Sequence, residues 1–269
     1  MKSVDFLDNL LRLLTVKLIL TSKDEFVTCK DDESITLLVG RLKKYDLLPV
    51  SCEKIECFVS KTRVERLLEE NQSVKVKEAK QPISKNHPIS EDEPIYDYLL
   101  LRKEPVFVTR QREVVGIVTP ADLNKTPSKM LFYVLISSFE RLLIKSIKNL
   151  DLTDREIEGC IGFTRWWQAR GRNEQARREN FDLSLIECLN TGDLIDLACK
   201  KPSIRKFLNY QSESEACKSL KSLVYLRNKV MHAGHFIIKN EKQLIRRRAE
   251  FVRIRQHIID LACDTVAVV

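Results

Sequence analysis

Glycine is scarce in this sequence, with seven residues in 269. None of them forms the Gly-rich spacing of a P-loop or of a dinucleotide-binding turn, so those two ways of holding phosphate are excluded. The eight cysteines are scattered and form no C-x-x-C pair, which argues against a disulfide framework and a zinc ribbon. Cys52, Cys57 and His87 lack the spacing of a zinc site, and we expect no bound metal.

Long hydrophobic runs and a targeting segment are also missing. The longest nearly apolar stretch, Met130–Phe139, is followed by Glu140 and Arg141, and it is well short of the ~18–20 residues that cross a membrane. The first residues, Met1–Asp5, include an early acid and lack the design of a secretory signal. With 43% hydrophobic and 31% charged residues, the composition is that of a globular protein. We expect a cytoplasmic protein with no membrane association.

Charge and proline divide the chain near residue 128. Residues 1–127 contain 21 Lys and Arg against 21 Asp and Glu, whereas residues 128–269 contain 25 against 17. The net charge of +8 therefore lies entirely in the second part, while seven of the eight prolines lie in the first. A neutral, turn-rich part followed by a basic, proline-poor part predicts two domains with different partners.

The neutral part begins with a predicted amphipathic helix over residues 3–20 and continues with two similar units. Each unit has the order helix, strand, strand, helix, and the two lie about 60 residues apart. The first is expected at 35–45, 48–52, 56–59 and 62–70, and the second at 94–101, 105–109, 114–118 and from 120 onward. This pattern predicts small sheets with flanking helices.

The segment 116–123 (GIVTPADL) contains candidate binding residues. A strand runs into a turn, and Thr119 and Asp122 follow at a helix start. Thr119 offers a hydroxyl and a backbone N–H where phosphate is favoured, and Asp122 is a fixed acceptor suited to ribose hydroxyls. In the alternative interpretation, Thr119 only caps the helix and Asp122 complements its dipole.

The same segment resembles the nucleotide-contacting segment of CBS domains, and residues 20–127 resemble a tandem CBS pair. The resemblance implies that an adenine nucleotide binds at Thr119 and Asp122 as a regulatory ligand, and residues 1–20 would pack on the pair. The first unit departs from the pattern, because Ser60 is followed by Arg63 where the ribose-binding Asp would be. We expect one competent nucleotide site per chain.

The basic part, residues 128–269, is predicted to be an all-α bundle of four or five helices, so the whole chain is α+β. One helix starts at Thr126-Pro127 and runs to about Ile147. Capping boxes start further helices at Thr153 and Ser212, and the helix that follows Ser212 is expected to end near Gly234. The last helix carries an apolar stripe: Leu244, Phe251, Ile258 and Ala262.

The stretch 165–172 (RWWQARGR) places arginines beside tryptophans. Guanidinium groups pair with phosphate and aromatic rings stack on bases. The candidate contacts for single-stranded RNA are Arg165, Trp166, Arg170 and Arg172. In the alternative interpretation, tryptophan belongs to the core and the arginines form a solvated face. Both interpretations also apply to a second group: Arg246, Arg247, Arg248, Arg253 and Arg255.

The segment 226–234 (LRNKVMHAG) lies at the predicted end of a long helix. Its pattern Arg227-Asn228-x-x-x-His232 resembles the catalytic signature of HEPN domains, helical bundles that often act as RNA nucleases. The resemblance implies a homodimer and RNA cleavage that needs neither a metal nor another catalytic cofactor. In the alternative interpretation this is a plain helix C-terminus, where His232 interacts with the last carbonyl groups.

The chemistry of RNA cleavage suits these three residue types. RNA carries its own nucleophile, the 2′-hydroxyl, so the protein must move protons and stabilise charge. Histidine titrates near neutral pH and suits His232 to proton transfer, while Arg227 would brace the phosphorane. Asn228 lies four residues before His232, on the same helix face, where it can hold the imidazole or a phosphate oxygen.

Helical spacing argues for a site shared between two chains. Arg227 and His232 are five residues apart, which is about 140° around a regular helix. They cannot both point at one small site without a long arginine reach, a distorted helix or a second chain. A two-fold interface would supply two arginines and two histidines to one cleft.

These observations predict a nucleotide-regulated, metal-independent endoribonuclease of the toxin or antiviral-defence type, acting as a homodimer on RNA. The helix at Thr126 begins four residues after Asp122 and would transmit nucleotide binding to Arg227 and His232. The alternative function is a non-catalytic, nucleotide-responsive scaffold that binds RNA or a protein.

Overall fold

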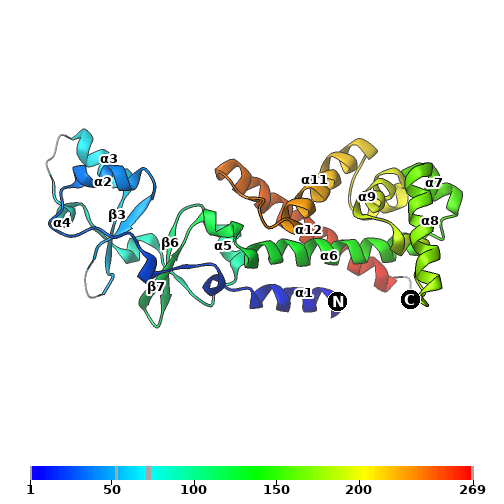
Figure 1. Cartoon of the computed structure of the whole chain (residues 1–269), viewed down its shortest axis with the longest axis horizontal. Coiled ribbons are helices and arrows are strands. Elements are labelled where there is room, and N and C mark those ends of the chain that lie inside the picture. The colour runs from blue at the N-terminus through cyan, green and yellow to red at the C-terminus, as the bar shows by residue number, and fades with distance from the viewer. Residues whose placement is uncertain (1, 52–53, 71–73, 268–269) are drawn as a thin grey trace. The chain divides into compact units, whose positions relative to one another are not determined.

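A computed structural model of the chain describes residues 2–51, 54–70 and 74–267 (Figure 1). The fold class is α+β, as predicted, with short strands and helices preceding a long series of helices. The chain forms two compact units. The N-terminal unit comprises Leu11–Ser128 and Ile238–Leu244, and the helical unit comprises Met1–Leu10, Lys129–Ile237 and Ile245–Val269.

The N-terminal unit contains two small sheets. In the four-stranded sheet the order is β1-β7-β6-β5, and all its pairs are antiparallel except β5 with β6. The three-stranded sheet has the antiparallel order β2-β3-β4. The strands are β1 (Thr21–Ser22), β2 (Leu47–Pro49), β3 (Cys57–Ser60), β4 (Gln81–Pro82), β5 (Ile89–Ser90), β6 (Val106–Arg110) and β7 (Glu113–Val118).

Short helices flank these sheets, as the repeated pattern predicts. Ser34 and Ser60 cap α2 and α3 by accepting hydrogen bonds from Thr36 N and Arg63 N. The α-helices are α2 (Ile35–Leu42), α3 (Lys61–Glu69), α4 (Val76–Ala79) and α5 (Ile95–Leu101). The 3₁₀ helices are η1 (Val16–Leu18), η2 (Lys23–Glu25), η3 (Ile83–Asn86) and η4 (Pro120–Asn124).

Gly116 allows β1 to lie against β7. Thr21 pairs with Ile117, and Ser22 pairs with Gly116. A Cβ atom at Gly116 would lie 2.6 Å from the backbone oxygen of Thr21 and 2.7 Å from Leu20 Cδ1. Only a glycine therefore fits where these two strands meet.

The predicted helix over residues 3–20 is shorter in the structure. The helix α1 covers Lys2–Leu13, and η1 follows after a break. The backbone N–H groups of Val16 and Lys17 donate to the carbonyl oxygens of Glu93 and Glu91. Because these groups bond to a distant segment, they do not continue the helix, although the apolar spacing continues to Leu18.

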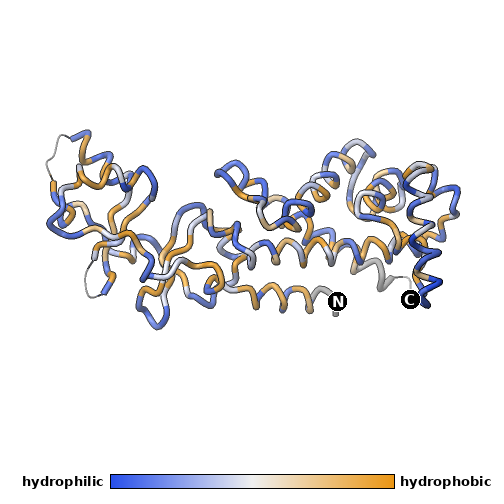
Figure 2. Tube along the Cα trace, in the orientation of Figure 1, coloured by the Kyte–Doolittle hydropathy of each residue, from blue (hydrophilic) through white to orange (hydrophobic). Residues whose placement is uncertain are grey.

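The helical unit is built around long, partly buried helices. Figure 2 shows hydrophobic residues recurring along α6, whereas the end of α8 is strongly hydrophilic. Phe132 on α6 packs edge-on against Phe251 on α12, with 6.3 Å between the ring centroids. The elements are α6 (Thr126–Lys148), α7 (Asp154–Ile161), α8 (Phe163–Arg178), η5 (Leu185–Cys188), α9 (Thr191–Lys200), α10 (Pro202–Phe207), α11 (Glu213–Met231) and α12 (Glu241–Ala267).

Helix boundaries in this unit follow local chemistry. Thr153 and Glu156 form the predicted capping box of α7, and Gly162, with φ of 88°, separates α7 from α8. The helix α11 begins at Glu213 but ends at Met231, earlier than the predicted end near Gly234. Over the ranges that the structure covers, no helix combines the length and apolar character needed to cross a membrane.

Candidate functional site

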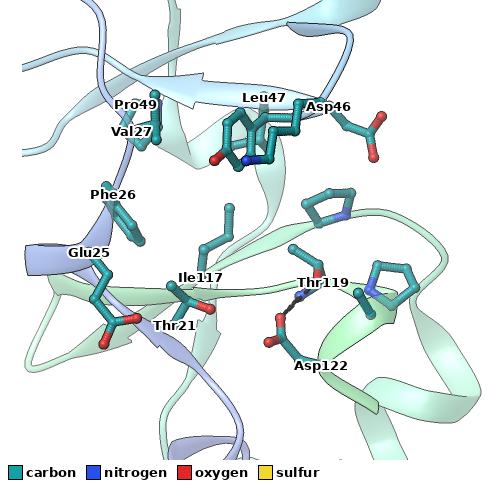
Figure 3. Close-up of a pocket in the computed structure, with 15 residues that line it drawn as sticks. Thr21, Glu25, Phe26, Val27, Asp46, Leu47, Pro49, Ile117, Thr119 and Asp122 are labelled. Carbon is teal, nitrogen blue, oxygen red and sulfur yellow. Dashed lines mark hydrogen bonds between the residues drawn. The ribbon is translucent and has the colours of Figure 1, made fainter. Parts of the chain in front are cut away.

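A pocket of about 440 Å³ lies within the N-terminal unit. Its walls come from the segment after β1, from residues around β2, and from the end of β7 with η4. Figure 3 shows Phe26 and Ile117 beside the cavity, with Thr119 and Asp122 together on the η4 side. Both residues predicted to contact a nucleotide therefore line one cavity.

Asp122 already holds Thr119 in place. Its Oδ2 atom accepts hydrogen bonds from the Thr119 backbone N–H at 2.7 Å and from the Thr119 hydroxyl at 2.8 Å. Its Oδ1 atom lies 2.8 Å from Lys125 Nζ. Asp122 thus supplies the carboxylate half of a capping box, and the two Thr119 donors suggested for phosphate are occupied. A carboxylate accepts about four hydrogen bonds, so Oδ1 has capacity for one more.

The rest of the pocket wall is mostly apolar and, in its charged groups, mostly acidic. Phe26, Val27, Leu47, Pro49 and Ile117 supply its apolar part. Three carboxylates line it, those of Glu25, Asp46 and Asp122, against the single ammonium group of Lys44. This arrangement suits a flat apolar ring and hydroxyl groups better than a chain of phosphates.

In the first of the two repeated helix–strand–strand–helix segments, the position that corresponds to Thr119 and Asp122 is occupied by internal contacts. Ser60 accepts from Arg63 N at 3.3 Å and donates to Gln81 Oε1 at 3.2 Å. The Arg63 Nε atom is buried and makes no hydrogen bond to any residue that the structure describes. Ser60 therefore acts as a helix cap at this position.

Arg227, near the end of α11, is part of an internal ion pair. Its Nε atom lies 3.1 Å from Glu140 Oε1 on α6, and its side chain is 38% exposed. The same Glu140 oxygen accepts a hydrogen bond from the hydroxyl of Thr191. The guanidinium is thus oriented by a neighbouring helix while part of it stays accessible to solvent. Asn228, the next residue, is exposed.

His232 lies just outside the helix. It is the C-cap of α11 and has extended backbone angles, φ −100° and ψ 117°. The buried Lys129 Nζ donates to the carbonyl oxygens of His232 and Ala233 at 3.2 and 2.7 Å. The imidazole is exposed, and its ring centroid lies 5.1 Å from that of His235.

Because of the position of His232, helical spacing no longer argues for a site shared between two chains. The separation of about 140° holds only if both residues are helical. Because the chain leaves the helix at His232, the direction of the imidazole is set by an extended residue. The sequence did not reveal this, although Gly234 signalled a nearby helix end.

All four predicted RNA contacts have partners within the fold, although Arg170 and Arg172 are exposed. Arg165 bonds to Asp193 at 3.1 Å and to Asp196 at 2.8 Å. Trp166 is 8% exposed, and Arg172 Nε donates to the carbonyl oxygen of Cys188 at 2.9 Å. The alternative interpretation, a core tryptophan, therefore describes Trp166.

A different part of α8 is available to solvent. Phe163 and Trp167 are each 61% exposed, and their rings stack at 6.1 Å with an angle of 22°. Arg170 is exposed and lies 5.4 Å from the centroid of the Trp166 ring, and it pairs with Asp154 at 3.4 Å and with Glu174 at 3.5 Å. Arg177 and Arg178 continue this face and form no ion pair within the described chain. Periodicity could have shown that Trp166 and Trp167 point in different directions, but not which one is buried.

The second arginine group is partly buried, which corrects the solvated-face interpretation for one of its members. Arg247 is 2% exposed and pairs with Glu250, which is equally buried. Arg255 pairs with Asp8 at 2.9 Å and is exposed.

No cluster of three or more metal-ligating side chains occurs within residues 2–51, 54–70 and 74–267. Cys52 lies outside the described residues. Together with Cys57 and His87 it lacks the sequence spacing of a zinc site. Cys57 is half-buried.

The sequence matches no protein-family model and no curated protein. Solved structures of CBS domains are similar to part of it. CBSX2, a CBS-pair protein from Arabidopsis thaliana, is 18% identical, with a TM-score of 0.33, over 40% of this chain and 90% of that one. A hemolysin-like protein of Oenococcus oeni containing a CBS domain is 14% identical, also with a TM-score of 0.33, over 44% and 93%.

A third similar structure is the CBS domain of a bacterial CNNM/CorC family Mg²⁺ transporter in complex with ATP. It is 19% identical over 45% of this chain and 92% of its own, with a TM-score of 0.33. CBSX2 has also been solved in complex with AMP, at 18% identity and a TM-score of 0.32 over 40% and 92%. The nucleotides in these complexes are properties of those proteins.

Proposed function

We propose that the N-terminal unit is a CBS pair that binds an adenine nucleotide, and that the helical unit is a HEPN-type, metal-independent endoribonuclease regulated by that nucleotide. The observation that carries the proposal is the cavity of about 440 Å³ that brings Thr119 and Asp122 together with apolar side chains. Its volume lies in the range of small-molecule sites, ~300–1,000 Å³.

The ligand would be a nucleotide with few phosphates. The adenine would lie among Phe26, Leu47 and Ile117, and the remaining lone pair of Asp122 Oδ1 would accept a ribose hydroxyl. Each added phosphate would bring negative charge toward Glu25 and Asp46. We therefore expect adenosine and AMP to bind more tightly than ATP.

Calorimetry with the full-length protein tests this site. Asp122→Asn should weaken AMP binding by about 10- to 100-fold, because a hydrogen bond to a charged group contributes ~1.5–3 kcal/mol. Asp32→Asn is the matched control, since Asp32 is exposed and does not line the pocket. Absence of binding by the unaltered protein at millimolar adenosine, AMP and ATP would rule out the sensing role.

In the proposed cleavage, the RNA 2′-oxygen bonds to the adjacent phosphorus while the bond from phosphorus to the 5′-oxygen breaks. His232 would take the 2′-hydroxyl proton, and a proton would be returned to the leaving 5′-oxygen. Arg227 would stabilise the charge on the phosphorane, and Asn228 would orient the imidazole or a phosphate oxygen. The products are a 2′,3′-cyclic phosphate and a 5′-hydroxyl end.

Two features around His232 support this role. Lys129 fixes the backbone at His232 and Ala233, so the exposed imidazole is attached to a restrained segment. On either side of it, Met231 and Phe236 are 53% and 57% exposed. Large apolar side chains that face solvent beside a polar motif favour a protein interface there, and we propose that a second copy of the chain covers them.

RNA would also contact the exposed face of α8. Phe163 and Trp167 present stacked rings to solvent, and Arg170, Arg177 and Arg178 lie on the same helix. Aromatic rings that stack on bases, next to guanidinium groups that pair with phosphates, suit single-stranded RNA. This surface adds Phe163, Trp167, Arg177 and Arg178 to the set that the sequence predicts, in which the exposed Arg170 and Arg172 stay candidates.

Cleavage is tested with labelled RNA in the presence of a metal chelator. His232→Ala should reduce the cleavage rate at least ~100-fold and leave RNA affinity nearly unchanged. His235→Ala is the matched control, because His235 is an exposed neighbour outside the motif. Undiminished cleavage by His232→Ala, or cleavage that requires added divalent metal, would refute the mechanism.

The two units are connected in a way that permits regulation. The helix α6 begins at Thr126, four residues beyond Asp122. Asn124 lies between them, and its side chain exchanges hydrogen bonds of 2.7 and 2.9 Å with the backbone of Ile238, three residues before α12 begins. A ligand that moves η4 would therefore act on the starts of both α6 and α12.

One contact favours the second candidate function, a nucleotide-responsive scaffold without catalysis. The ion pair between Arg227 and Glu140 gives this arginine a structural role that needs no RNA. A scaffold would shift the mobility of RNA without converting it, and Arg227→Ala would then lower stability rather than a cleavage rate. The chelator experiment separates the two functions directly.

A further inference from the structure

The helical unit contains a second cavity, of about 380 Å³, between α11 and α12. It is lined by hydroxyl groups from Tyr210, Ser219 and Ser222 and by cationic groups from Lys218, Arg246 and Arg253. None of these residues belongs to the motif of Arg227 and His232 or to the exposed face of α8. The lining is therefore rich in hydrogen-bond donors.

The carboxylates around the cavity are already engaged. Glu250 is 2% exposed and pairs with Arg246 at 3.0 Å and with the buried Arg247 behind it. Glu215 accepts a hydrogen bond from the backbone of Gln211 at 3.0 Å. The charges of Lys218 and Arg253 are balanced by no ion pair in the part of the chain that the structure describes. The cavity consequently has an excess of positive charge.

A chain of hydrogen bonds orients the donors in this cavity. Arg253 Nη1 donates to Ser219 Oγ at 2.9 Å, and the Tyr210 hydroxyl donates to the same oxygen at 2.6 Å. Tyr210 Oη also lies 2.8 Å from His257 Nε2. The Nδ1 atom of His257 is buried without a partner among the described residues.

The unpaired Nδ1 atom of His257 indicates which groups donate and which accept in this series of hydrogen bonds. An orphaned buried N–H group is rarer than an orphaned acceptor, so the proton belongs on Nε2, which then donates to Tyr210. Tyr210 in turn donates to Ser219 Oγ, which receives a second hydrogen bond from Arg253. The hydroxyl hydrogen of Ser219 is left to point at another acceptor.

We propose that this cavity binds a phosphate group. A tetrahedral oxyanion would accept hydrogen bonds from the Ser219 hydroxyl and from the remaining N–H groups of Arg253, with Lys218 adding charge. The phosphate would come from an RNA strand or from a free phosphate compound. Assignment to an RNA strand rests on the proposed function, whereas phosphate binding itself does not.

The position of the cavity on α11 connects it to the motif. Ser219 lies thirteen residues before His232, which corresponds to about 20 Å along the helix. An RNA strand held by a phosphate at Ser219 and Arg253 would have to span about this distance to reach His232. Binding at this cavity would then position the substrate.

The test measures binding of sodium pyrophosphate to the full-length protein by calorimetry and of a short single-stranded RNA by fluorescence anisotropy. Lys218→Gln should weaken pyrophosphate binding about threefold, because this lysine is exposed, and Arg253→Gln about tenfold or more. Lys221→Gln is the matched control: it removes the same charge from an exposed position on the same helix, and Lys221 does not line the cavity.

Each result has a distinct meaning. Loss of pyrophosphate and RNA affinity together in Lys218→Gln supports an RNA phosphate, and loss of pyrophosphate affinity alone supports a free phosphate compound. Equal effects of Lys218→Gln and Lys221→Gln, or no effect of either, would overturn the proposal whatever Arg253→Gln does. Cleavage failing in the unaltered protein would refute the nuclease but leave pyrophosphate binding as expected.

Discussion

The buried His257 should make the stability of the protein depend on pH. Burial lowers the pKa of this imidazole from 6.5 to about 4, and the nearby charge of Arg253 adds to the effect, while Asp260 opposes it. In the unfolded chain the pKa returns to about 6.5, so between pH 4 and 6.5 the unfolded state binds more protons. The free energy of unfolding should therefore rise with pH across this window and be fully present above it.

The size of the effect follows from the difference in pKa. A shift from 6.5 to about 4 corresponds to about 3 kcal/mol, since each unit is worth about 1.4 kcal/mol. Urea unfolding at a series of pH values measures it, and NMR of the histidine ring protons gives the pKa directly. The structural reason is that a proton on Nδ1 would be buried with no acceptor among the described residues.

His257→Gln isolates this contribution. The variant should lose most of the pH dependence between 4.5 and 6.5, because glutamine keeps a polar group near Tyr210 but binds no proton. The control His232→Gln removes an exposed histidine and should retain the slope. An unchanged slope in His257→Gln, or an imidazole that titrates near 6.5 in the folded protein, would refute the reasoning.

Two further predictions concern packing and charge. Gly116→Ala should lower the free energy of unfolding by about 1–3 kcal/mol, because its Cβ would lie 2.6 Å from Thr21 O. The control Gly171→Ala has open space around it and should stabilise α8 by about 0.5–1 kcal/mol in urea unfolding. Equal effects of the two variants would contradict the close approach of β1 to β7. Arg165→Gln should lower the free energy of unfolding by about 1–2 kcal/mol, since its partner Asp193 is fully buried while Arg165 itself is 42% exposed. RNA affinity, measured by fluorescence anisotropy, should be unchanged. Loss of RNA affinity at full stability would return Arg165 to the RNA surface.

Regular periodicity predicted the helices whose apolar face is continuous. In α12 the four residues predicted as an apolar stripe are all at most 3% exposed: Leu244, Phe251, Ile258 and Ala262. Capping residues located the starts of α7 and α11, because a cap is a local interaction between neighbours. A cap or an apolar stripe involves only residues that lie close together in the sequence, so it can be recognised without the structure.

Features that depend on distant partners were not predictable. Arg247 lies in a run of three arginines that suggests a solvated face. It is buried because Glu250 and the carbonyl oxygen of Ile237 accept hydrogen bonds from its guanidinium group. The short strands β1 and β4 have two residues each, too few for an alternation pattern. Glu140, which orients Arg227, is 87 positions away, and nothing in either local sequence indicates the pair.

The order in which the chain is synthesised matters for a protein whose units are interleaved. The boundaries of the two units mean that the polypeptide passes from one to the other four times. Residues 238–244 belong to the N-terminal unit but leave the ribosome after residues 129–237, which at ~5–20 residues per second is a delay of roughly 5 to 20 s. During that interval Asn124 lacks its partner at Ile238. The N-terminal unit therefore reaches its final form only after residues 238–244 have been synthesised, when most of the helical unit that it is proposed to control has also been made.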